Sequence, residues 1–362
     1  MSRNQLAGNP ALRILIVRVG AMGDVLHGMP AVAALRQALP GAHIGWAVEP
    51  RWAPLLVAAH SSGRSAAMPL VDAIHLVEAK AWSKRPLSLA TLHSMHALRR
   101  SLRAGSYDLA IDLQGSIRSA VVARASGARY IVGSASPRER PARLLYTAAI
   151  PARAEHVVDQ GVEIASAAVR LPLFAAQVPL PVDSAAEAWC NALLGGDARL
   201  LVFLAPTAGW GAKAWPAQHY GELARQLSRE GYRVLVNAAP SSPDPVARNV
   251  VEGSGGAALA VPCTLPQLIA LLRRVRLVVA GDTGPLHLAA ALGVPVVGIF
   301  GPTSPARNGP YATRAITLRN ANSQTDHRRH AAVEHGLQQI TTAEVLAAAR
   351  QLLQADRTMP HG

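Results

Sequence analysis

The sequence RLVVAGDTGPLHLAAALGVPVVGIFGPT, residues 276–303, is the stretch that decides the fold of this chain. A short apolar run leads into a Gly-rich turn, and an apolar helical stretch and a second apolar run follow. Pro285 suits the first turn of a helix, where its missing N–H costs nothing, and Gly293 suits the helix end. The stretch therefore predicts strand, turn, helix and strand, with free N–H groups and the positive end of the helix dipole at the turn. Asp282 and Thr283 make this turn suitable for a nucleotide diphosphate, although an ordinary strand-to-helix turn has the same pattern.

Apolar runs alternate with helical stretches along both halves of the chain. The expected strands are residues 13–19, 43–48, 70–77, 109–113, 200–204, 233–237, 277–280 and 294–300. The expected helices run from near Pro30 to 39 and over residues 87–103, 219–230, 266–273 and 342–353. This alternation predicts an α/β protein with parallel, doubly wound sheets.

A Pro-punctuated stretch, residues 171–183, separates two such halves. The helix that follows it is expected to be capped by Asp183 or Ser184. We expect an N-terminal domain over residues 1–178 and a C-terminal domain over residues 186–355, with a cleft between them that the strand ends face.

The charge of the chain is positive and unevenly placed. The net charge is +14, and residues 1–180 hold 20 basic and 10 acidic residues, against 16 and 12 in residues 181–362. The first half should therefore meet an anionic partner. Nucleic acid is not expected, because aromatic residues make up only 4% of the chain and are not interleaved with the basic ones. A phosphorylated glycolipid at a membrane surface fits better, although a GC-rich genome that favours arginine would give a similar charge.

The composition of the chain limits which cellular compartment and which cofactors are expected. No apolar run is long enough to span a membrane, and the N-terminus does not resemble a signal peptide. Cys190 and Cys263 stand alone, without metal or disulfide spacing, so a cytoplasmic protein is expected. The histidines at 327, 330 and 335 lie in a polar stretch without a carboxylate scaffold, and we expect neither a metal nor another cofactor.

Lysine is scarce: the chain has 33 arginines and three lysines, which are Lys80, Lys84 and Lys213. Where arginine replaces lysine freely, the lysines that remain indicate positions that need a compact ammonium group. Lys213, in a loop before an expected helix, could reach the phosphates of a nucleotide held at the 281–285 turn, or could be an ordinary solvated lysine. Lys80, Lys84 and nearby arginines could hold phosphates of an acceptor, or could form a solvated charged face.

The first turn, residues 20–24, places Asp24 at the end of the first expected strand. This carboxylate could act as a base, but spacing alone favours a capping role. The turn lacks the full G-x-G-x-x-G pattern of dinucleotide-binding proteins. Glu49, at the end of the second strand, does stand where a ribose-binding acid would, so an NAD-dependent oxidoreductase remains a weaker alternative.

Several motifs in this order resemble the glycosyltransferase family that contains the lipopolysaccharide heptosyltransferases. The resemblance covers nearly the whole chain and is closest to the members that add the first heptose to the Kdo-lipid A core. The motifs that carry it are residues 14–18, 22–27, 112–115, 213–216 and 281–287.

The resemblance implies a GT-B fold, which has two Rossmann-like domains, an N-terminal acceptor domain and a C-terminal domain for ADP-heptose. It implies that Asp24 is the general base and that Lys213 contacts the donor phosphates without a metal. The other implied donor-binding positions are Thr207, Asp244, Cys263, Asp282, Thr283, Gly284 and His287. The implied acceptor-binding positions are Lys80, Trp82, Lys84 and Arg138.

The chain departs from the family pattern in the donor half. Asp244 stands near the position where the family often has a ribose-binding glutamate, and Cys263 occupies the position of the adenine contact. The expected function is an inverting heptosyltransferase that acts on Kdo-lipid A from the cytoplasmic face of the inner membrane, with peripheral membrane contact. The alternatives are a later-core heptosyltransferase, a relative that uses another nucleotide sugar, and a non-catalytic glycolipid-binding protein.

Overall fold

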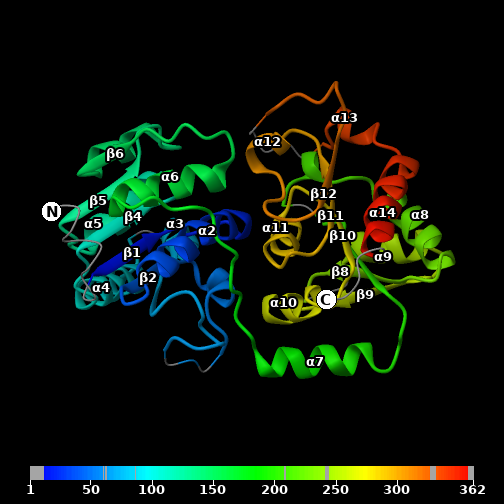
Figure 1. Cartoon of the computed structure of the whole chain (residues 1–362), viewed down its shortest axis with the longest axis horizontal. Helices are drawn as coiled ribbons and strands as arrows, with labels where there is room; N and C mark the ends of the chain where they lie inside the picture. Colours follow the sequence, from blue (N-terminus) through cyan, green and yellow to red (C-terminus); the bar gives the residue numbers. More distant parts are fainter. Residues whose placement is uncertain are drawn as a thin grey trace. The chain divides into compact units, whose positions relative to one another are not determined.

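The computed structural model describes residues 12–59, 61, 63–85, 87–207, 209–240, 244–326 and 332–357. The chain forms two compact units, which divide between Val182 and Asp183. Each unit has its own parallel β-sheet with helices packed on it (Figure 1). In the described ranges, no helix is both long and apolar enough to cross a bilayer.

The first unit is built on a six-stranded parallel sheet with the order β3-β2-β1-β4-β5-β6. Its strands are β1 (Arg13–Val17), β2 (His43–Val48), β3 (Ala73–Leu76), β4 (Leu109–Asp112), β5 (Tyr130–Ser134) and β6 (Ala148–Ile150). Its α-helices are α2 (Met22–Ala38), α3 (Ala79–Lys84), α4 (Leu89–Ala104), α5 (Ile117–Ala125) and α6 (Val157–Val169). Two 3-10 helices complete it, η1 (Pro50–Leu55) and η2 (Arg140–Leu145).

The second unit is built on another six-stranded parallel sheet with the order β12-β11-β10-β7-β8-β9. Its strands are β7 (Leu201–Ala205), β8 (Arg233–Ala238), β9 (Ala258–Pro262), β10 (Leu277–Gly281), β11 (Val296–Phe300) and β12 (Ala315–Arg319). Its helices are α7 (Ser184–Leu194), η3 (Gly211–Lys213), α8 (Ala217–Arg229), α9 (Pro245–Gly253), α10 (Leu265–Leu272), α11 (Gly284–Ala291), α12 (Pro305–Asn308), α13 (His335–Gln338) and α14 (Thr342–Arg357).

Both units share one topology. Numbered within its own unit, each sheet has the strand order 3-2-1-4-5-6, which is that of the Rossmann fold. The order reverses between β1 and β4 in the first unit and between β7 and β10 in the second. Loops that leave the carboxyl ends of these central strands diverge there and leave room for a ligand. The sequence-based prediction of parallel, doubly wound α/β sheets is confirmed.

The central strands form because they are buried on both faces. Residues 14–17 of β1 and all five residues of β10 are buried, as expected for strands with helices on both sides. On one face of the first sheet, Leu15 and Val17 pack in a core with Leu98 and Leu102 of α4. These cores fix the carboxyl ends of the strands, from which the candidate site residues extend.

Two predicted helix ends are confirmed. The Asp183 carboxylate accepts the Ala186 N–H at 2.9 Å and caps the start of α7. Gly293 follows the end of α11 with φ +75°, the left-handed conformation that favours glycine after a helix. Pro285 lies in the first turn of α11, as expected.

The prediction for the first helix of the N-terminal half was wrong at its start. The helix α2 begins at Met22, not near Pro30, and Pro30 lies inside it. Twelve of its 17 residues are buried, so packing offsets the lost hydrogen bond at Pro30. Asp24 consequently stands in the first turn of a helix and not in a loop.

Candidate active site

Three predicted donor-site residues form one ionic cluster in the second unit, which we call the Lys213 cluster: Lys213, Asp282 and His287. The Lys213 ammonium donates to Asp282 Oδ2 at 2.5 Å, and His287 Nε2 lies 2.9 Å from Asp282 Oδ1. Lys213 ends η3 after β7, and Asp282 follows β10. Because β7 and β10 are neighbours, their two loops meet where the strand order reverses.

The Asp282 carboxylate is buried, with 8% of its surface exposed. Burial alone would raise its pKa, but the hydrogen bond from His287 and the Lys213 charge hold the pKa well below its usual range. Asp282 is therefore ionised in the folded protein, and both of its oxygens already have partners. A carboxylate placed in this way orients the ammonium group of Lys213; it is not itself suited to contact a phosphate, which it would repel.

The N-terminus of α11 lies beside this cluster. Thr283 is its N-cap residue, but the Thr283 hydroxyl donates to the Gly281 carbonyl at 3.2 Å and does not cap the helix. A Cβ atom at Gly281 would lie 2.9 Å from the Lys213 carbonyl oxygen, so a side chain there would force the two loops apart. A cation and the N-terminus of a helix are thus held together at one strand end, an arrangement that suits an anion.

Other predicted donor-site residues follow β7, β8 and β9, the half of the sheet on the other side of the β10 loop. The Thr207 hydroxyl donates to Asp244 Oδ2 at 3.4 Å. Asp244 is also the N-cap of α9, where it accepts the N–H groups of Val246 and Ala247, a role that the sequence analysis did not assign. Cys263 follows β9, and burial raises the pKa of its thiol to about 12, so the thiol is neutral. These residues therefore lie along the carboxyl edge of the second sheet, beyond the Lys213 cluster.

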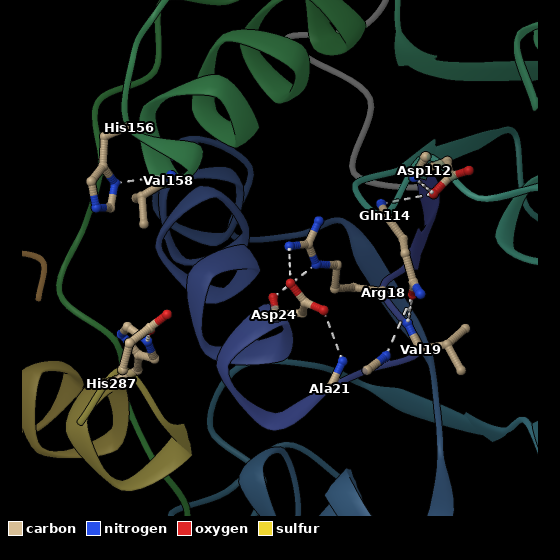
Figure 2. A network of polar contacts seen from close by, with 12 residues as sticks. Arg18, Val19, Ala21, Asp24, Asp112, Gln114, His156, Val158 and His287 are labelled. Atoms are coloured by element: carbon tan, nitrogen blue, oxygen red, sulfur yellow. Dashed lines mark hydrogen bonds and ion pairs between the residues drawn. The ribbon is translucent and has the colours of Figure 1, made fainter. Parts of the chain in front are cut away.

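In the first unit, the Asp24 carboxylate is held from two sides (Figure 2). Arg18 Nη2 donates to Oδ1 at 3.0 Å, and the Ala21 N–H donates to Oδ2 at 2.9 Å. Arg18 Nε also donates to the Asp24 carbonyl at 2.8 Å. The capping role favoured by spacing is therefore present, and 36% of the Asp24 side chain nevertheless remains exposed.

The loop that carries Asp24 is fixed by the neighbouring strand. Gln114 Oε1 accepts the Val19 N–H at 2.6 Å (Figure 2). Asp112, at the end of β4, accepts the Gln114 N–H at 2.9 Å and also bonds the hydroxyls of Ser119 and Tyr146. The buried Asp112 thus shapes the turn that presents Gln114 to the loop before Asp24.

The predicted acceptor residues lie on both sides of Asp24 in strand order. Lys80, Trp82 and Lys84 are on α3, which follows β3, and Arg138 follows β5. Each of these strands is two positions from β1, or roughly 10 Å at the usual strand spacing. Lys84 and Arg138 are exposed, and Trp82 donates its indole N–H to Ser94. Cationic groups therefore flank Asp24 along the carboxyl edge of the first sheet.

Two residues of this site received no role from the sequence, Arg18 and Gln114. The sequence did offer an indication of both, because Arg18 comes directly after β1 and Gln114 comes two residues after β4. The register pairs Val17 with Asp112, so the residues just beyond these two strand ends must meet. Only the strand order, which places β4 beside β1, shows that they do.

The resemblance implies that Asp24 is the general base, and on that basis we expect Arg18→Met to lower turnover roughly tenfold, because the Asp24 carboxylate loses the donor that orients it while the Ala21 N–H remains. Arg18→Lys should restore part of the loss, since an ammonium can replace one of the two contacts. Steady-state kinetics, with ligand affinity measured separately, would check this. Equal turnover for the Met and Lys variants would show that Arg18 does not act through Asp24.

Among the described residues, no group of three or more His, Cys, Asp or Glu side chains is placed to hold a metal. Of the three histidines considered from the sequence, those at 327 and 330 lie outside the described residues. His335 Nε2 lies 2.9 Å from the Gln339 side-chain amide.

Two Rossmann-order sheets in one chain, each with candidate binding groups at its carboxyl edge, define the GT-B class of fold. The Escherichia coli heptosyltransferase WaaC, solved with ADP, matches with a TM-score of 0.77 and 26% identity over 94% of this chain and all of that one. Lipopolysaccharide heptosyltransferase 1 of Pseudomonas aeruginosa is 31% identical over 85% of this chain and 83% of its own length. Lipopolysaccharide heptosyltransferase 2 of Escherichia coli is 27% identical over 94% of this chain and 99% of its own length.

The model of glycosyltransferase family 9 (heptosyltransferase) matches residues 95–337. The chain belongs to this family and is a glycosyltransferase. Membership of this glycosyltransferase family argues against the oxidoreductase alternative. Glu49, on which that alternative rested, pairs with Arg51 at 2.6 Å.

Proposed function

We propose that this enzyme transfers heptose from ADP-heptose to the Kdo-lipid A inner core of lipopolysaccharide and inverts the anomeric carbon. The observation that carries the proposal is the Lys213 cluster at the N-terminus of α11, which places a cation and helix N–H groups together at the end of β10. The identity to a type 1 heptosyltransferase supports the choice of acceptor.

In the proposed reaction, Asp24 removes the proton from the acceptor hydroxyl. The oxygen attacks the anomeric carbon of the heptose, and the bond to the diphosphate breaks with its electron pair on ADP. Negative charge grows on the leaving diphosphate, where Lys213 and the N–H groups of α11 stabilise it without a metal. Asp282 keeps the ammonium group in place, and His287 holds Asp282. Thr207, Asp244, Cys263, Thr283 and Gly284 would complete the donor site.

The acceptor is anionic, and the residues beside Asp24 fit that charge. Lys80, Lys84 and Arg138 would bind its phosphate and carboxylate groups on both sides of the base. Trp82 would pack against a sugar ring. The enzyme would work at the cytoplasmic face of the inner membrane, in peripheral contact with the bilayer that holds the acceptor.

A later-core heptosyltransferase is the second candidate. The chain is 27% identical to a type 2 and 24% identical to a type 3 enzyme of Escherichia coli, which is close to its identity to type 1. The acceptor-binding residues would decide between these types.

ADP release from ADP-heptose, measured in EDTA with and without Kdo₂-lipid A, tests the proposal. Release that requires this acceptor supports the type 1, metal-independent activity. Release only with a longer, heptose-bearing core would favour the second candidate. No release by the folded protein with either acceptor would direct the search to other nucleotide sugars.

A further inference from the structure

We propose that α4 and the residues just before it form a docking surface for an anionic phospholipid bilayer, which we call the α4 surface. It comprises Leu87, Leu89, Leu92, Met95, Arg99, Arg100 and Arg103. The inference deepens the proposed function, since a lipid-linked acceptor lies at a bilayer, but it rests on its own observations.

Apolar side chains at the start of α4 are exposed to an unusual degree. Leu87 and Leu89 are 89% and 85% exposed, and Leu92 and Met95 are 53% and 44% exposed. Leu89 and Leu92 are not needed for the core, because Thr91, Leu98 and Leu102 are the buried residues of α4. Met95, seven residues before Leu102, lies at the border of that buried side. Neighbouring exposed apolar residues of this size are typical of an interaction site.

The same side of α4 continues as a basic surface. Leu92, Arg99 and Arg103 are separated by seven and four residues, so they share one face of the helix. From Ala79 to Tyr107 the chain contains six basic residues and no acidic one. An apolar first half and a cationic second half on one helix face are suited to a headgroup layer with negative charge.

Topology places the apolar end of this surface beside the reacting edge of the sheet. The helix α4 leads from β3 back to the start of the parallel strand β4, so its N-terminus lies at the carboxyl edge. Asp24 follows β1 at that same edge. Ile117, the 44% exposed first residue of α5, lies there for the same reason. A bilayer at this surface would hold a lipid-linked acceptor near Asp24 without requiring the lipid to leave the membrane.

Charge selects the bilayer over a second copy of the chain. A symmetric pair through α4 would bring the three arginines of each copy together, and like charges would oppose it, although Glu78 lies nearby and accepts the Ser94 hydroxyl at 2.8 Å. Anionic phospholipid has the complementary charge, and its acyl region can take up the leucines.

The test is sedimentation with vesicles of phosphatidylcholine, with and without phosphatidylglycerol, using full-length protein without substrates. Wild-type protein should bind the anionic vesicles and be released by salt. The variant Leu87→Gln/Leu89→Gln/Leu92→Gln should bind at least roughly tenfold more weakly, and Arg99→Gln/Arg100→Gln should lose the preference for phosphatidylglycerol. A matched control is Leu200→Gln/Leu259→Gln in the second unit, whose leucines are 40% and 45% exposed and which should bind normally.

Wild-type levels of vesicle binding by the triple variant would overturn the proposal, as would failure of the wild type to bind. Sedimentation velocity would reveal the competing outcome, a wild-type dimer that the triple variant does not form. Turnover on a deacylated, water-soluble acceptor should be unchanged in the triple variant, which shows that it is folded. If vesicle binding is lost in the variant but neither protein transfers heptose, the surface stands and the proposed function fails.

Discussion

Asp24→Asn is expected to lower acceptor-dependent turnover by roughly 100- to 10,000-fold, the range of a lost general base. The amide cannot take up the proton of the acceptor hydroxyl. Its side-chain oxygen can still accept the Ala21 N–H, so the first turn of α2 should remain intact. Initial-rate kinetics with ADP-heptose and the acceptor measure the loss, and calorimetry with ADP should show unchanged donor binding.

A matched control is Asp72→Asn, which removes the charge of another Asp in the first unit. Asp72 pairs with Arg36 and accepts the Ile44 N–H at 2.8 Å, so this change should cost stability but little turnover. Near-normal turnover in Asp24→Asn would rule out Asp24 as the base and leave it the capping role alone.

The local sequence did not predict the helix in which Asp24 lies. Gly23, Gly28 and Pro30 are poor helix formers, so the local pattern gave no sign of a helix before Pro30. The helix nevertheless starts at Met22, because burial along most of its length stabilises it. Asp24 proves to be a capping residue whose second oxygen is held by Arg18, and the two roles that seemed alternatives are compatible.

Several central strands could be predicted from the sequence because they are buried on both faces and therefore appear as continuous apolar runs. The apolar runs at β1, β7, β10 and β11 predicted strands in those places, with ends within two residues of the observed ones. The central strand β5 was not predicted, because Gly133 interrupts its short apolar run after Ile131 and Val132. The edge strands β6, β9 and β12 were not predicted either. Their residues are mostly half-buried or exposed, so no continuous apolar run indicates them.

Which site residues contact each other depends on the order of the strands in each sheet, and local sequence patterns do not reveal that order. Lys213 and Asp282 were each expected near a nucleotide, but they are 69 residues apart, and nothing local indicates that they bind each other. Their contact follows from the crossover that brings β10 beside β7. The same reason explains why Gln114 was assigned no role at the loop before Asp24.

Lys213→Ala is the second large expected effect, a loss of about 3–4 kcal/mol in transition-state stabilisation, or roughly 100- to 1,000-fold in kcat/KM for ADP-heptose. The ammonium group acts on charge that grows as the diphosphate leaves, so kcat should fall more than donor affinity. Its removal also leaves the buried Asp282 carboxylate with His287 as the partner that remains in the Lys213 cluster, and that carboxylate would repel the diphosphate.

These two contributions can be separated by a double-mutant cycle with Asp282→Asn. If Lys213 acts through its own charge, the double variant stays slow, because removing the carboxylate restores no cation. If Lys213 only shields Asp282, the double variant recovers most of kcat/KM. Lys84→Ala, which removes the same charge from the first unit, should leave the ADP dissociation constant unchanged. An unchanged kcat/KM in Lys213→Ala would remove Lys213 from the mechanism and leave the N-terminus of α11 to stabilise the leaving group alone.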